Sequence, residues 1–92
     1  MIKCVTEEHI RKSGLLKALA HPVRLRIAEG LMTCECNVDK MVRKLDLPQS
    51  TVSQHLSILR DKGILTMRKD GVKTCYCVDD PRVRKLLQAL ES

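Results

Sequence analysis

Apolar residues recur at intervals of three or four along most of the chain, which predicts a succession of amphipathic helices. Pro22 suits the first turn of a helix, Asn37 is placed to cap another, and Gly30 and Gly63 are expected stops. The predicted helices span about residues 7–19, 22–29, 38–45 and 49–62. Because only a short turn separates the last two, they form a helix-turn-helix pair.

After Gly63 the apolar period falls to two, and residues 64–68 and 73–78 are predicted strands. Asp70-Gly71 between them predicts a hairpin turn, and Pro81 begins a final helix. Residues 33–36 also alternate like a short strand. These elements predict a winged helix-turn-helix that is mainly α with a small antiparallel β-hairpin, in the order α-α-(β)-α-α-β-β-α. At 92 residues, the sequence supports one such domain over residues 1–92.

The fourth helix presents a polar face suited to reading DNA. Val52 and Leu56 anchor it to the core, and basic residues follow at its end and on the hairpin. A solvated helix end explains the polar face alone, but the basic hairpin favours DNA, since cations bind phosphates. The predicted DNA-binding residues are Gln49, Ser50, Thr51, Ser53, Gln54, His55, Arg60, Arg68, Lys69 and Lys73.

Composition narrows the class of partner. The net charge is +6 and Tyr76 is the sole aromatic residue, so duplex DNA fits and a single-strand binder that stacks bases does not. Three scattered histidines form no nucleophile–base pair, which argues against an enzyme. A winged-helix protein-interaction module that binds no DNA remains an alternative.

The final helix carries an apolar stripe that a monomer of this size would leave exposed. Pairing this helix across a two-fold axis would bury the stripe and set two recognition helices about 34 Å apart. The sequence therefore predicts a homodimer on an inverted-repeat operator, unless the stripe covers its own domain. The predicted interface residues are Val83, Leu86, Leu87 and Leu90.

Five cysteines are unusual in so short a chain. Their odd count and the absence of a signal-peptide core predict a cytoplasmic protein with reduced thiols, and no apolar run is long enough for a membrane. Such thiols are candidates for metal binding or redox chemistry, although a free cysteine also packs as a small hydrophobe.

Residues 16–27 and 47–60, with the hairpin at 68–73 and Tyr76, resemble the ArsR/SmtB family of small bacterial repressors. The resemblance implies a homodimeric winged-helix repressor that an inducer releases from its operator. Members that sense soft metals carry a Cys-x-Cys where Cys34 and Cys36 lie, and some add an N-terminal cysteine, as Cys4 would here. The family's other metal site, on the last helix, uses histidine, which residues 80–87 lack.

A second Cys-x-Cys, Cys75 and Cys77, lies on the predicted outgoing hairpin strand, where residues two apart share a face. In winged-helix folds the segment before the third helix commonly pairs with this strand, so Cys34 and Cys36 would approach it. We expect no obligatory cofactor. The predicted inducer is a soft ion such as As(III), Cd(II), Pb(II) or Zn(II). The alternative is a reversible disulfide or polysulfide, and half-buried packing is the third interpretation.

Overall fold

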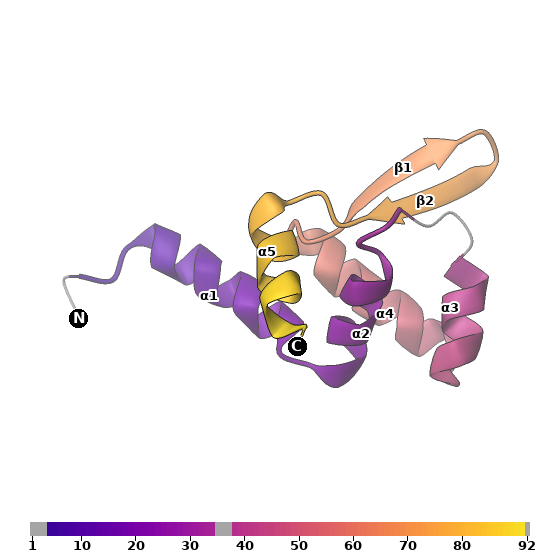
Figure 1. Ribbon diagram of the computed structural model, residues 1–92, viewed down its shortest axis with the longest axis horizontal. Helices are drawn as coiled ribbons and strands as arrows, with labels where there is room; N and C mark the ends of the chain where they lie inside the picture. Colours follow the sequence, from indigo (N-terminus) through magenta and orange to yellow (C-terminus); the bar gives the residue numbers. More distant parts are fainter. Residues whose placement is uncertain (1–3, 35–37, 92) are drawn as a thin grey trace.

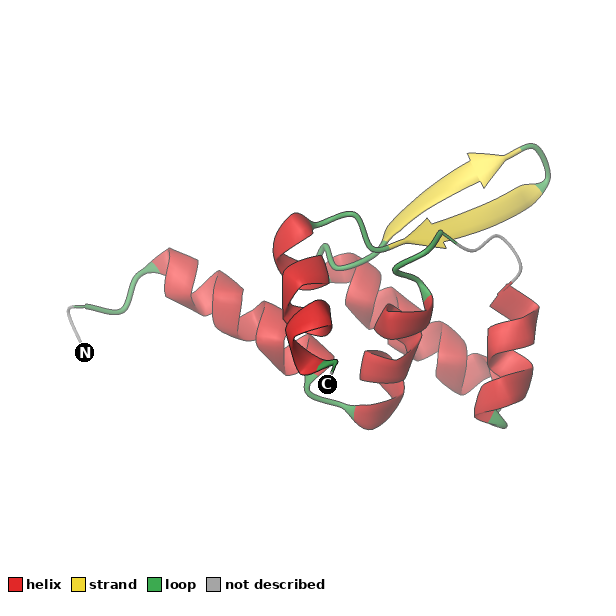
Figure 2. Cartoon of the chain, viewed as in Figure 1, coloured by secondary structure: helices red, strands yellow, loops and turns green. Residues whose placement is uncertain are grey.

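The computed structural model describes residues 4–34 and 38–91, and its element order confirms the predicted fold (Figures 1 and 2). The elements are α1 (Glu7–Leu19), α2 (Pro22–Gly30), α3 (Val38–Leu45), α4 (Gln49–Asp61), β1 (Thr66–Asp70), β2 (Lys73–Cys77) and α5 (Pro81–Leu90). Residues 33 and 34 form no strand, and the predicted cap Asn37 lies outside the described residues. Over the described ranges, no helix is both long and apolar enough to span a bilayer.

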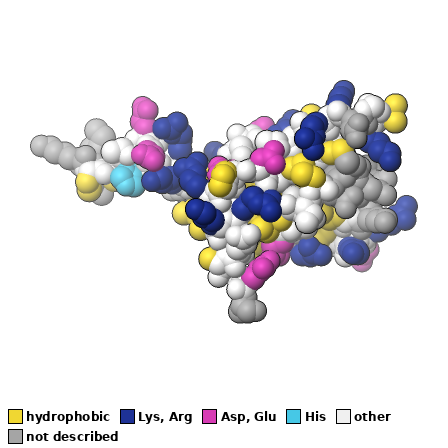
Figure 3. All heavy atoms as spheres, turned by 45° about the horizontal axis from the view of Figure 1, so that its top comes forward, with side chains coloured by type: hydrophobic (Ala, Val, Ile, Leu, Met, Phe, Trp, Pro, Cys, Tyr) yellow, Lys and Arg dark blue, Asp and Glu magenta, His cyan; other side chains and the backbone are white. Residues whose placement is uncertain are grey.

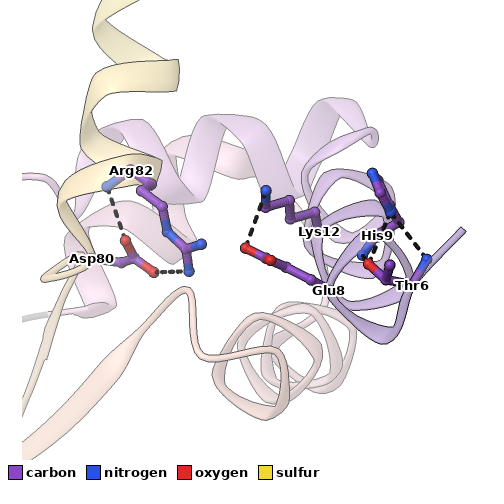
Figure 4. Close-up of polar contacts among 6 residues, drawn as sticks. All are labelled: Thr6, Glu8, His9, Lys12, Asp80 and Arg82. Carbon is purple, nitrogen blue, oxygen red and sulfur yellow. Dashed lines mark hydrogen bonds and ion pairs between the residues drawn. The ribbon is translucent and has the colours of Figure 1, made fainter. Parts of the chain in front are cut away.

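Side-chain caps fix where three of the helices begin. Thr6 Oγ1 accepts from the His9 backbone N–H (3.4 Å), and Nδ1 of the His9 ring accepts from the Thr6 backbone N–H (3.1 Å). These two hydrogen bonds form a capping box (Figure 4). His21 caps α2 through Nδ1, which accepts from the Val23 N–H at 3.1 Å. Asp80 caps α5 by accepting from the Arg82 N–H at 2.9 Å (Figure 4). Each cap accepts a hydrogen bond from a backbone N–H at the helix start that has no acceptor within the helix.

The core draws on α2, α4, α5 and the segments that flank the hairpin. Its fully buried side chains are Ile27, Leu31, Val52, Leu59, Ile64, Leu65, Val78, Val83 and Leu87. Since Ile64 and Leu65 are both buried, residues 64 and 65 do not alternate as a strand would, and β1 begins at Thr66 instead of the predicted residue 64. Gly63 makes the preceding turn with a φ of 76°.

Two parts of the chain project from this body. The β1–β2 hairpin extends from one end, with Thr66 opposite Cys77 at its base, and turns through Gly71 at a φ of 65° (Figure 2). The N-terminal half of α1 extends in the opposite direction, away from the other helices (Figure 1). Among the described residues its one ion pair, Lys12 with Glu8 at 3.2 Å, lies within the helix itself. The arm therefore has little support from its own chain.

Candidate nucleic-acid interface and thiol site

The helix-turn-helix is formed by α3, a tight turn and α4. Asp46 adopts a φ of 52° in that turn, a conformation that asparagine and aspartate tolerate. Val52 and Leu59 bury one face of α4 in the core. The predicted contact residues at its start remain on the surface. Gln49, Ser50, Ser53 and Gln54 are exposed, and Thr51 is half-buried.

His55 occupies the edge of this face instead of its centre. It follows Val52 by three positions and precedes Leu59 by four, so the helical period turns it partly toward the core. Its ring lies 4.7 Å from that of His21, and its Nδ1 accepts from Arg24 Nη1 at 3.4 Å. Burial, with the adjacent His21 and Arg24, lowers the pKa of His55 below its usual value. A neutral His55 therefore fastens α4 to the start of α2.

The hairpin supplies the basic surface. Arg68, Lys69 and Lys73 are all exposed on it, and Lys and Arg side chains gather around this end of the molecule (Figure 3). Arg60, exposed near the end of α4, directs Nη1 to the Met67 sulfur on β1 at 3.6 Å. Through Arg60, the end of α4 thus contacts the strand from which this basic hairpin projects.

Two of the predicted sensing cysteines are joined. Cys34, exposed in the connector after α2, forms a disulfide with the buried Cys77 at the end of β2, and their Cα atoms are 4.4 Å apart. The Val78 N–H donates to the Leu31 carbonyl at 3.0 Å, so the connector does pair with the outgoing strand.

The remaining cysteines differ in their state. Cys75 is buried in β2 and is not a free thiol. Cys4 is a free, exposed thiol before α1, and Cys36 lies outside the described residues. Asp79, a residue that the sequence did not single out, lies near the Cys34–Cys77 bond. Its carboxylate accepts from the Thr66 hydroxyl at 2.7 Å.

An arginine on α5 links the two segments that the disulfide joins. Arg84 Nη1 donates to the carbonyl of Met32 (2.6 Å), two residues before Cys34, and to the carbonyl of Val78 (2.9 Å), directly after Cys77. The thiol pair, the base of the hairpin and α5 are therefore connected by hydrogen bonds. Periodicity could not reveal this role, because one of the contacts spans 52 positions.

The predicted interface stripe on α5 divides between two environments. Val83 and Leu87 are buried in the core of their own chain, so they cannot contact a partner, whereas Leu86 and Leu90 are 40% and 66% exposed. A groove of about 980 Å³ separates α5 from α1 and also borders the end of α4. The large apolar side chains exposed on the two helices are Ile10, Leu16, Leu86 and Leu90.

A helix-turn-helix followed by a basic hairpin defines a winged helix-turn-helix protein. Residues 21–66 match the family described as "Bacterial regulatory protein, arsR family", and the chain belongs to this family of regulators. It is 40% identical over 76 residues to the biofilm growth-associated repressor of Agrobacterium fabrum, covering 83% of this chain and 65% of the relative.

Solved structures of similar regulators have the same fold. The transcriptional repressor PagR of Bacillus anthracis superimposes with a TM-score of 0.82 at 36% identity, covering 92% of this chain and 98% of PagR. HlyU of Vibrio cholerae N16961 gives 0.84 at 30% identity, with 94% of each chain covered. The reduced form of the same HlyU gives 0.81, covering 91% of this chain and 88% of HlyU. At these identities and coverages the likeness extends over nearly the whole fold.

Proposed function

We propose that the chain is a homodimeric repressor that binds duplex DNA through α4 and the hairpin, and that the thiol state of Cys34 and Cys77 sets its affinity for the operator. One observation carries the second part. The disulfide joins the returning strand of the hairpin, one of the two elements expected to contact DNA, to the connector that leads toward the helix-turn-helix.

Membership in a regulator family, the exposed polar start of α4 and the basic hairpin support DNA binding. Phosphate contacts release counterions, so the affinity should fall steeply with salt. Reversing the charges of Arg68 and Lys69 to glutamate should weaken binding and flatten that slope, whereas Arg26→Glu, on the exposed surface of α2, should change it little. Binding that is absent or insensitive to salt would favour a protein-interaction module instead.

The α1 arm and the exposed apolar residues of α1 and α5 support a homodimer. Ile10 and Leu16 are 63% and 51% exposed, and a second copy is the partner that offers the same two helices in return. Leu16→Glu should shift the protein to monomer in sedimentation equilibrium and weaken binding to an inverted repeat. A variant that remains dimeric would place the interface elsewhere.

In this proposal oxidation is the inducing event. The thiolate of the exposed Cys34 attacks a low-molecular-weight disulfide and releases one thiol; the Cys77 thiolate then displaces the second thiol from the mixed disulfide. The oxidant thus accepts two electrons while the Cys34–Cys77 bond forms. The closed bond fixes the base of the hairpin against the connector, so the hairpin loses freedom to adjust to the DNA groove. Only such a difference between the two states can shift the binding equilibrium.

The decisive measurement compares the DNA affinity of protein reduced with a dithiol and protein oxidised with glutathione disulfide. A coupling typical of regulators, about 1–3 kcal/mol, corresponds to an affinity loss of about 5- to 150-fold on oxidation. Cys34→Ser, which prevents the Cys34–Cys77 bond, should remove most of the response, and Cys4→Ser, which removes the free thiol before α1, should retain it. Equal affinities of the two wild-type forms would refute thiol control.

A metal-responsive repressor is the second candidate, favoured by Asp79. The sulfur atoms of Cys34 and Cys77 and a carboxylate oxygen of Asp79 lie within 4.8 Å of one another. In the reduced protein this set of two thiolates and one carboxylate fits zinc or a softer divalent ion. Titration with cadmium, lead and arsenite, followed by thiolate absorption and DNA binding, tests it. Asp79→Asn should weaken metal binding while leaving the response to glutathione disulfide intact.

A further inference from the structure

A second, smaller cavity lies where α4 meets the hairpin. Its volume is about 140 Å³, and it is lined by Ser53, Leu56, Ser57, Arg60 and Tyr76. Ser53, Ser57 and Arg60 are spaced four and three residues apart, so they share one face of α4. Tyr76 closes the cavity from β2. The cavity therefore lies between the predicted recognition helix and the hairpin.

The charged side chain of this cavity is held in place from the hairpin side. Arg60 Nη1 contacts the sulfur of Met67, which pairs with Tyr76 across the two strands. Tyr76 is half-buried and packs against the hydrophobic core, which limits the positions open to its ring. Helix and strand thus converge on the same small space, although they are distant in sequence.

The lining has the chemistry of an anion site. Three hydroxyl groups and a guanidinium can all donate hydrogen bonds, and the lining includes no carboxylate. Arg60 is permanently charged, and its planar group matches the geometry of phosphate oxygens. A phosphate oxygen accepts hydrogen bonds and carries negative charge, so it satisfies both features.

We infer that this cavity binds one phosphate of the DNA backbone, an assignment that rests on the proposed DNA binding. Its position favours a backbone phosphate over a free anion, because α4 and the hairpin flank the strand that a winged helix would contact. The site also adjoins the sensor. Tyr76 lies between Cys75 and Cys77 and faces the opposite side of β2, so any shift of the strand on oxidation moves one wall of the phosphate site.

The test uses the reduced full chain and a duplex selected in vitro for binding. Tyr76→Phe and Ser57→Ala each delete one hydroxyl per subunit with little change in shape, and each should lower the affinity about tenfold per half-site, as expected for a hydrogen bond to a charged group. Arg60→Gln removes one phosphate contact in each half-site of the dimer, so it should reduce the slope of log K against log salt by about 1.8. The matched controls are Ser13→Ala on α1 and Arg26→Gln on α2, which should leave both quantities unchanged.

Methylphosphonate substitution locates the contact. Neutralising one phosphate per half-site should cost the wild type about tenfold per half-site but cost Arg60→Gln much less, because the cationic partner of that phosphate is already absent. If the wild type binds the duplex and no position shows this coupling, the phosphate site is refuted while the proposed function stands. Competition by inorganic phosphate at constant ionic strength, lost in Tyr76→Phe, would assign a free anion and overturn the inference. Failure of the wild type to bind any duplex would refute the proposed function and this site with it.

Discussion

Replacing Arg84 with glutamine tests how the thiol segments are held to α5. The arginine donates to the Met32 and Val78 carbonyls at 2.6 and 2.9 Å, and the shorter, neutral glutamine cannot reach both. Hydrogen bonds from a charged donor are each worth about 1.5–3 kcal/mol. Since Arg84 is only half-buried, we expect the pair to contribute about 2–3 kcal/mol to the free energy of unfolding, after solvent screening.

The assay is urea denaturation of the reduced protein at a fixed protein concentration, so that neither the disulfide nor dimer dissociation masks the change. The midpoint should fall accordingly, and the melting temperature should drop by about 10–20 °C. Arg82→Gln is the matched control, because Arg82 lies on the same helix but contacts only Asp80 among the described residues. Equal midpoints for the two variants would show that the Arg84 contacts do not hold the junction together.

Three further predictions concern stability. Asp80→Ala removes the α5 cap and should lower the free energy of unfolding by about 1 kcal/mol in denaturant titrations. Hydrogen bonds to Arg82 lower the pKa of Asp80, so the stabilisation by the cap is full above the unfolded pKa. It should disappear as the pH falls through the lower folded pKa. His55→Gln should flatten the stability profile in mild acid. Because the pKa of His55 is lowered in the folded state, its contribution to the free energy of unfolding is complete above about pH 6.5 and is lost as the pH falls through the folded pKa. A variant with the same pH profile of stability as the wild type would contradict this. Gly63→Ala, at a φ of 76°, should destabilise by about 1 kcal/mol although its new methyl group meets no neighbour, so a neutral result would show that the backbone relaxes.

Most of the fold could be predicted from the sequence because local signals agree with the global structure. Pro22 and Pro81 begin helices, the Asp70-Gly71 turn closes the hairpin, and the apolar period separates helices from strands. The first strand was predicted two residues too early. Ile64 and Leu65 are both buried, which reflects packing beneath the hairpin and not the alternation of a strand.

The candidate site could be predicted only in part. The spacing of Cys75 and Cys77, with the topology of a winged helix, predicted that the connector would approach β2, as the Cys34–Cys77 bond shows. The sequence shows an apolar stripe on α5 but not which of its residues pack into the core of their own chain. In the structure Val83 and Leu87 pack there. Asp79 follows Cys77 by two residues, but it approaches Cys34 only through folding, so the sequence alone did not identify it as a ligand.

The Cys34–Cys77 bond also has a consequence for the survival of the polypeptide in a cell. It closes a loop over a sequence separation of 43 residues, and on the chain-entropy account such a cross-link stabilises the fold by about 4 kcal/mol. Reduction would raise the population of open, protease-susceptible chains by about three orders of magnitude. The reduced form, which is proposed to occupy operators, is thus also the form more readily degraded by proteases. Bound DNA would stabilise it by mass action. Molecules that find no operator would be cleared fastest under reducing conditions.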